Sequence, residues 1–230
     1  MEFDWSVLQD NFTYLLWGRL ADGEPGGVLL TLIMAASAGV LALLAGVLMA
    51  ALAWRFGGRT RKILFIWASF IRGIPLIFVI FWLYFLLPVV FGGSIPGPLT
   101  VILALAWFTS AAVMHSTLAG LEALPRGQTE AGIASGMSYG KVLLFVLLPQ
   151  AWPNLLPSYL GLLISLVKDT SLAFIVNVPE LTTVAGQVNN RVQIYPAEIF
   201  LFVGLMYYVL CASLAALAGK ALRRRRRLHT

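Results

Sequence analysis

Five stretches of the sequence are long and apolar enough to cross a membrane as helices, and this feature constrains the fold more than any other. About 20 apolar residues span a hydrocarbon core. The stretches cover about 27–54, 63–90, 98–121, 142–167 and 197–218. Of the 230 residues, 60% are hydrophobic and 11% are charged, which is too little charge to cover a soluble domain. The sequence therefore predicts an all-α integral membrane protein with about five transmembrane helices.

Prolines interrupt two of the five stretches. The second contains Pro75 and Pro88, and the fourth contains Pro149, Pro153 and Pro157. Proline removes a backbone donor and bends a spanning helix, which is tolerated where neighbouring helices or a cavity cover the break. We therefore expect these two helices to be bent or broken, as in a bundle that forms a pathway rather than in a passive anchor.

Most basic residues of the connections fall on one side of the membrane if there are five spans. Those of the first side are Arg55, Arg59, Arg61, Lys62, Arg126, Lys141, Lys220 and the five arginines at 223–227. The opposite side has Arg19, Lys168 and Arg191. Since cytoplasmic loops of membrane proteins are enriched in Lys and Arg, we predict an N-terminus outside and a C-terminus in the cytoplasm.

This orientation divides the chain into three parts. We expect an external segment at 1–26, a transmembrane domain at 27–220 with a cytoplasmic loop at 122–149, and a basic cytoplasmic tail at 221–230. A basic block directly after a hydrophobic segment is typical of an anchor beside membrane lipids rather than of a nucleic-acid-binding arm. We expect no cleavable signal peptide, because the acidic first residues lack a basic start. The single Cys211 excludes an intramolecular disulfide.

The loop at 122–149 interrupts the apolar pattern with polar residues and glycines. A short helix can begin near Thr129, and Gly136 suits its C-cap, because a positive φ is easiest without a side chain. Ser138 suits the N-cap of a second helix that runs toward Pro149. We therefore predict a helix–turn–helix knob at the membrane surface.

The first helix of this knob carries Glu130 and several small residues. We expect Glu130 near the positive N-terminal end of that helix, and Ala131, Gly132 and Ala134 on its exposed surface. Small exposed residues allow close packing into a groove of another protein, but an ordinary amphipathic connector could have the same composition. The residues alone leave both uses open.

The knob resembles the EAA loop of ABC importer permeases. That family shows Glu-Ala-Ala, then a glycine, then Ile-x-Leu-Pro, and the matching residues here are Glu130-Ala131-Gly132, Gly136 and Val146-x-Leu148-Pro149. The resemblance implies that the knob is a coupling helix that fits a cleft on an ATP-hydrolysing subunit. It assigns this coupling to Glu130, Ala131, Gly132, Gly136, Ser138, Leu148 and Pro149.

Further segments resemble the polar amino-acid branch of these permeases, which includes histidine, glutamine, arginine and glutamate/aspartate systems. They are FIRGIPL at 70–76, GQTEA at 127–131, LLPQA at 147–151 and KDTSL at 168–172. The start of the chain, EFDW at 2–5, is similar to glutamate/aspartate permeases in particular. The resemblance covers about 28–220.

This resemblance implies a type I (MetI-like) importer permease fold and a multi-pass protein of the bacterial cytoplasmic (inner) membrane. It implies a second permease, either an identical copy or a paralogue, two ATPase subunits that hold ATP and Mg, and an extracytoplasmic amino-acid-binding protein. No cofactor, metal or nucleic acid is expected on this chain itself. The chain would be a transport subunit rather than an enzyme.

One segment departs from that branch. The branch often has an acidic residue and an arginine before the coupling loop, where this chain has His115 and Leu118. A substrate or gating role for that pair is therefore open here. A lone histidine such as His115 is more often a hydrogen-bonded helix residue than a ligand.

Charged residues inside the spans mark candidate substrate contacts, because each costs about 2.5–3.5 kcal/mol to insert. An amino acid needs a forked donor for its carboxylate and an acceptor for its ammonium group. Arg72 and Asp169 could supply these, with hydroxyls from Thr170 and Ser171. The alternative is a structural ion pair between Arg72 and either Asp169 or Lys168.

Two other function classes fit the sequence less well. An ion-coupled secondary amino-acid transporter predicts inverted repeats and paired intramembrane carboxylates, whereas five spans cannot be halved and Asp169 has no second carboxylate. A membrane enzyme needs a cluster of His, Asp, Glu or Cys at one depth. The stretch 135–142 does not match a phosphate-binding loop, so the energy source must lie on another chain.

Five spans also bury too little to form a gated pathway alone, which implies a dimer of permeases. The external stretch 177–196 carries Glu180, Arg191 and Tyr195. It is a candidate contact for an extracytoplasmic binding protein, although its composition also fits a simple loop.

Overall fold

The protein, seen here in a computed structural model, is described over residues 5–193 and 196–226, with side chains described as far as Lys220. In chain order the elements are α1 (Ser6–Trp17), β1 (Gly18–Arg19), η1 (Leu20–Asp22), β2 (Glu24–Pro25), α2 (Gly27–Phe56), α3 (Gly58–Gly73), α4 (Leu76–Phe91), α5 (Gly97–Glu122), α6 (Arg126–Ala134), α7 (Tyr139–Val142), η2 (Leu143–Leu147), α8 (Leu148–Asp169), η3 (Thr170–Val176), α9 (Leu181–Val192) and α10 (Pro196–Arg226). The predicted start at 1–4, Tyr195 and the end of the basic tail at 227–230 lie outside the described residues.

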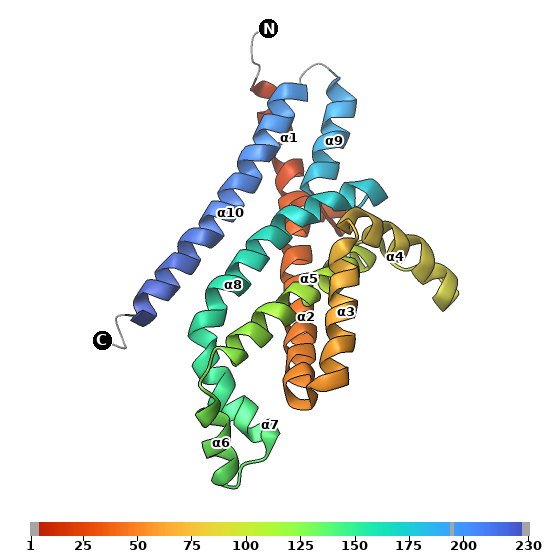
Figure 1. Cartoon of the computed structure of the whole chain (residues 1–230). Coiled ribbons are helices and arrows are strands. Elements are labelled where there is room, and N and C mark those ends of the chain that lie inside the picture. Colours follow the sequence, from red (N-terminus) through yellow and green to blue (C-terminus); the bar gives the residue numbers. More distant parts are fainter. Residues whose placement is uncertain (1–4, 194–195, 227–230) are drawn as a thin grey trace.

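The helices form an elongated bundle (Figure 1). α1 and α9 lie at one end of it, and α6 and α7 lie at the other. Within the described residues, four helical runs are long and apolar enough to cross a membrane, and the bent pair of α3 and α4 makes a fifth candidate. α2, α5 and α10 confirm the first, third and fifth predicted spans.

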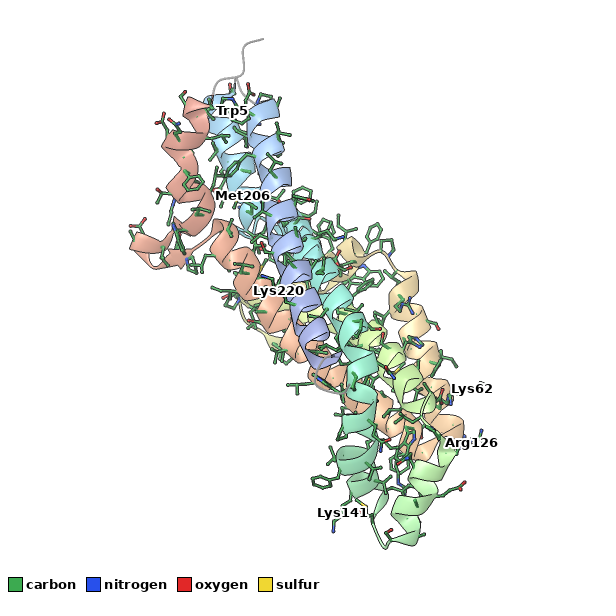
Figure 2. The ribbon with its side chains drawn as sticks, turned by 90° about the vertical axis from the view of Figure 1, so that its left-hand side faces the viewer. Trp5, Lys62, Arg126, Lys141, Met206 and Lys220 are labelled. Atoms are coloured by element: carbon green, nitrogen blue, oxygen red, sulfur yellow. The ribbon has the colours of Figure 1, made fainter. Side chains whose placement is uncertain are left out.

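Basic side chains mark the end of the bundle that carries α6 and α7. Figure 2 shows Lys62, Arg126 and Lys141 gathered there, with Trp5 at the opposite end. Because basic residues concentrate on the cytoplasmic side, we assign the α6–α7 end to the cytoplasm and the α1–α9 end to the outside.

The second predicted span is two helices rather than one. α3 and α4 are bent by 99° at the break between Gly73 and Leu76. Pro75 excludes the helical conformation at the residue before it, and Ile74 accordingly has φ −97° and ψ 134°. The break at this proline is confirmed, whereas Pro88 lies inside α4 without ending it.

The fourth predicted span is continuous, so the expected break at its prolines is wrong. The helical run extends from Tyr139 to Val176. Pro149 directly follows the π-helical turn η2 within this run, so its missing amide donor falls where the hydrogen-bond pattern is already irregular. Ahead of it the π-helical turn η2 widens the backbone, and the Leu148 amide donates to the Leu143 carbonyl five residues back.

Small residues allow α2 and α5 to pack closely along the middle of the bundle. An added Cβ on Gly46 would lie 2.5 Å from the Cβ of Val113 on α5, so only glycine fits there. The buried small residues of α2 recur every three or four positions: Ala35, Ala38, Ala42, Gly46, Ala50 and Ala53. Such a stripe favours close contact of spanning helices, because van der Waals packing drives their association in lipid.

The outer end is joined to the spans by backbone hydrogen bonds. The β1–β2 hairpin pairs Gly18 with Pro25, and the Gly27 amide at the start of α2 donates to the Pro179 carbonyl at 2.9 Å. A separate apolar core holds α1, α9 and α10 together around Leu15, Leu181 and Ile199, all fully buried. The outer helices are therefore fixed relative to the first span.

Candidate functional site

The predicted knob exists at the cytoplasmic end, formed by α6, α7 and the turn between them (Figure 1). Gly136 has φ +81° in that turn, which confirms the predicted left-handed position. Ser138 precedes α7 with φ −69° and ψ 156°, as an N-cap residue does, but its side chain makes no capping hydrogen bond. The knob thus has the predicted form, closed by a glycine turn.

Two details of the knob differ from the prediction. α6 begins at Arg126, directly after Pro125, so Glu130 lies in the middle of the helix and not near its N-terminal end. Gly132 is buried rather than exposed, because α7 packs against it. A Cβ added to Gly132 would lie 2.8 Å from Cγ2 of Val142. Glycine at this position therefore allows the two helices to meet.

The outer face of α6 has no partner within the described chain. Glu130, Ala131 and Ala134 are all exposed, and Glu130 forms no ion pair among the described residues. A carboxylate between small exposed side chains allows the close approach of another surface with a donor. This geometry favours a docking face over a simple connector.

Side-chain contacts attach the knob to two spanning helices. The Arg55 guanidinium at the end of α2 lies 4.1 Å from the centre of the Tyr139 ring on α7. The same ring meets Trp54 edge-on, with centroids 6.3 Å apart. On the other side, Gln150 Nε2 of α8 donates to Gln128 Oε1 of α6 at 3.1 Å. Sequence reasoning missed these contacts, because no periodicity relates Arg55 to Tyr139.

A salt bridge joins α3 and α5 close to the knob. Arg61 donates two hydrogen bonds to the Glu122 carboxylate, the longer one at 3.2 Å. Both side chains are more than 40% exposed, so the pair adds little stability. The pair lies at the end of α5 from which the knob begins.

The four predicted substrate residues lie on two separate elements. Arg72 is exposed in the last turn of α3, beside the break. Asp169 and Ser171 are half-buried at the junction of α8 and η3, where Thr170 is fully buried. Among the described residues no ion pair joins Arg72 to Asp169, and a pair of Arg72 with Lys168 is excluded because both side chains are cations. The structural ion pair considered above is therefore absent here.

The hydroxyls at this junction are engaged by the backbone. Thr170 Oγ1 donates to the Val167 carbonyl and Ser171 Oγ to the Lys168 carbonyl, each at 2.7 Å. Both bonds cap carbonyls at the end of α8. Of the three candidate residues at this junction, Asp169 and Ser171 keep exposed surface and Thr170 does not.

The two departures from the branch pattern pack as ordinary interior residues. His115 on α5 is half-buried and meets the Phe65 ring of α3 edge-on, with centroids 4.7 Å apart. Leu118 is 1% exposed in the core between α2, α3 and α5. These positions therefore hold α3 against α5.

Glu180 is a feature that sequence reasoning misjudged. Its side chain is fully buried, so it cannot contact a binding protein, contrary to the expectation above. It caps α9, accepting from the Thr182 and Thr183 amides at 2.9 Å each and from the Tyr207 hydroxyl at 2.8 Å. Burial raises the pKa of Glu180, and these hydrogen bonds oppose that rise. The carboxylate thereby ties α9 to α10.

The described residues contain no group of three or more His, Cys, Asp or Glu side chains that could hold a metal ion.

Comparisons with known proteins agree with this architecture. Residues 42–227 match the family described as binding-protein-dependent transport system inner membrane component. The probable glutamine ABC transporter permease protein GlnP of Bacillus subtilis is 37% identical over 152 residues, which cover 65% of this chain and 69% of that protein. The glutamate/aspartate import permease protein GltK of Escherichia coli O6:H1 is 28% identical, covering 97% of this chain and 98% of GltK.

A solved structure has the same fold. A crystal structure of an amino acid ABC transporter with histidines superposes with a TM-score of 0.80 at 24% identity, covering 97% of this chain and 100% of that one. At this identity the likeness shows the fold alone. With the family match over most of the sequence, the chain belongs to the binding-protein-dependent transport system inner membrane components, as a multi-pass permease subunit of an ABC importer with the type I fold.

Proposed function

We propose that this chain pairs with a second permease, an identical copy or a paralogue, to import polar amino acids such as glutamate or aspartate. Two separate ATPase subunits bind ATP with Mg and hydrolyse it, and an extracytoplasmic amino-acid-binding protein delivers the substrate. The glutamine and glutamate/aspartate permeases among its relatives support this substrate class. Membership of the family excludes the ion-coupled secondary transporter.

The observation that carries this proposal is the unpartnered face of α6 at the basic end of the bundle. Exposed small residues surround Glu130 there, and contacts with α2 and α8 attach the knob to the spanning helices. In this proposal α6 enters a groove of the ATPase subunit, with contacts or support from the predicted coupling residues. These are Glu130, Ala131, Gly132, Gly136, Ser138, Leu148 and Pro149.

Two contacts can transmit a movement of the knob to the membrane-spanning helices. The Arg55–Tyr139 contact leads to α2, and the Gln128–Gln150 bond leads to α8. The π-helical turn η2 lies between α7 and α8, and such turns are irregular points in a helix that often mark functional sites. Closure of the ATPase subunits would thus tilt α2 and α8 together, while η2 absorbs the change in angle.

The proposed substrate pathway uses the polar residues at the two interrupted helix ends. Arg72 is a free forked donor for the substrate carboxylate, since no ion pair among the described residues engages it. Asp169 is the acceptor for the ammonium group, with Ser171 and Thr170 beside it. A rotation that opens the α8–η3 junction would be needed to expose Thr170, which is fully buried here.

Uptake into proteoliposomes tests the proposed function. Vesicles that hold this chain, its permease partner and the ATPase subunits should accumulate labelled glutamate when ATP and binding protein are supplied on opposite sides. Unlabelled glutamate, aspartate, glutamine, histidine and arginine then compete in turn, and the amino acid carried competes best. Uptake that continues without ATP, driven by an ion gradient, would refute the proposal.

The same vesicles test the substrate pathway separately. Asp169→Lys should leave assembly with the ATPase intact and reduce uptake about tenfold or more, since a charge-assisted hydrogen bond contributes about 1.5–3 kcal/mol. Asp10→Lys, at an exposed position of α1 outside the span, makes the same change in charge and is the matched control, which should transport normally. Full uptake by the Asp169→Lys variant would remove Asp169 from the pathway while leaving the importer function standing.

A further inference from the structure

A depression of about 500 Å3 lies at the outer end of the protein. α1, the β1–β2 hairpin, the link before α9, and α9 itself form its walls. Its polar lining comes from Arg19, Glu24, Asn177, Asn190 and Arg191, all of which are exposed. Nothing in the transport pathway proposed above uses these residues.

The walls of this depression are fixed before any partner arrives. The Gly26 amide donates to the Trp17 carbonyl at 3.0 Å, and the Gly27 amide to the Pro179 carbonyl at 2.9 Å. Gly18 has φ +65°, and a Cβ there would lie 2.4 Å from the Cα of Gly26. The hairpin and the link before α9 are thus joined through their backbones, which preorganises the site.

The depression gathers positive charge on a side of the membrane where such charge is scarce. Three basic residues were assigned to the outside, and two of them, Arg19 and Arg191, line this one site. Neither forms an ion pair among the described residues. The Arg191 guanidinium lies 5.3 Å from the centre of the Tyr14 ring. The Tyr14 hydroxyl donates to Gln187 Oε1, so the ring that contacts the arginine is itself held in place by a hydrogen bond.

We propose that this depression is the docking site for an acidic side chain on the surface of the extracytoplasmic binding protein. The inference rests on the proposed function, in which such a protein delivers the substrate. Arg19 and Arg191 would grip the carboxylate, because guanidinium groups bind carboxylates with paired hydrogen bonds. The amides of Asn177 and Asn190 offer further donors. Glu24 at the same site would repel a second acidic side chain of the binding protein and attract a basic one. This pattern of charge would fix the orientation in which the binding protein docks.

Charge at this site should act on the encounter with the binding protein rather than on the transport step. Complementary charges at the rim of an interface mainly raise the association rate, and salt weakens the attraction between these charges. Uptake is half-saturated at a certain concentration of loaded binding protein. At low ionic strength, Arg19→Gln and Arg191→Gln should each raise that concentration about tenfold and leave the maximal rate of uptake unchanged. The difference from the unmodified chain should shrink as ionic strength approaches about 0.15 M.

The assay uses the complete complex in proteoliposomes and the purified amino-acid-binding protein of the same source. Gln9→Glu is the matched control, because it makes the same change in net charge on exposed α1 outside the depression. It should leave half-saturation within about twofold, since isolated surface charges contribute little. Thermal unfolding of each variant checks that the fold is kept.

Two outcomes overturn the proposal. Unchanged half-saturation in the Arg19→Gln, Arg191→Gln double variant would show that the binding protein docks elsewhere. A lower maximal rate at unchanged half-saturation would show that the arginines act on substrate passage instead. In either case, retention of the ATPase subunits and uptake at saturating binding protein would show that the importer function itself still holds.

Discussion

Gly132→Leu is expected to abolish uptake while the chain still inserts into the membrane. The Cβ of any other residue at this position would lie 2.8 Å from Cγ2 of Val142, so leucine must push α6 away from α7. Even Gly132→Ala is an overpacking change, which typically costs about 1–3 kcal/mol. If α6 must keep its angle to dock, that cost corresponds to about a tenfold or larger loss in affinity for the ATPase subunit.

A second substitution makes this prediction specific. Val142→Ala removes the methyl groups that meet the new side chain, so the Gly132→Ala, Val142→Ala variant should regain uptake. Gly140→Ala is the matched control, since an added Cβ there meets nothing within 4 Å. The measurement is ATP-dependent uptake together with the ATPase retained in detergent. Normal uptake by Gly132→Leu, or no rescue by Val142→Ala, would contradict the proposed role of the knob.

Glu180→Ala is expected to cause the largest loss of stability of any single substitution at the outer end. It leaves the two capping amides of α9 without their acceptor, and the Tyr207 hydroxyl keeps its contact with Thr182 Oγ1 at 3.2 Å. Each buried donor without a partner costs about 1–3 kcal/mol, so a total loss of about 3 kcal/mol is expected. For a chain of this size the unfolding temperature should fall by about 6–12 °C. Thermal unfolding in detergent checks this.

Glu180→Gln removes the charge, keeps one of the two acceptor oxygens, and has a distinct pH signature. Burial raises the pKa of Glu180 above its ordinary value of 4.5. The folded protein therefore binds this proton more tightly than the unfolded chain, and the stabilisation is present below pH 4.5 and lost as the pH rises through the folded pKa. Glu180→Gln lacks this loss, so its free energy of unfolding relative to the unmodified chain should rise from pH 4.5 toward neutral. A constant difference across this range would contradict the assignment.

The spans could be predicted because lipid imposes a simple rule of length and apolarity. α2, α5 and α10 follow it directly. Prolines were harder to interpret, since their effect depends on which turn they occupy. Pro75 lies between two helices and ends the first, whereas Pro149 follows the π-helical turn η2, where the hydrogen-bond pattern of a continuous helix is already irregular.

The shape of the knob was predictable, but its internal packing was not. Gly136 needs a positive φ, which leaves a strong local signal in the sequence. Gly132 is buried because α7 folds back onto it, and that contact joins residues ten apart across a turn. Likewise, the burial of Glu180 depends on Tyr207 in another helix, and local composition gives no sign of it.

The central claim is that the exposed face of α6 meets an ATPase subunit on the cytoplasmic side. Ala134→Cys, in a chain whose native cysteine is replaced by Cys211→Ala, places a single thiol on that face for a thiol-reactive photo-crosslinker. We expect a cross-link to the ATPase subunit in inside-out vesicles, weakened by Glu130→Gln and absent when the thiol is moved to Asp22→Cys. Labelling of the Ala134→Cys thiol from outside intact cells, with no cross-link to the ATPase, would contradict it.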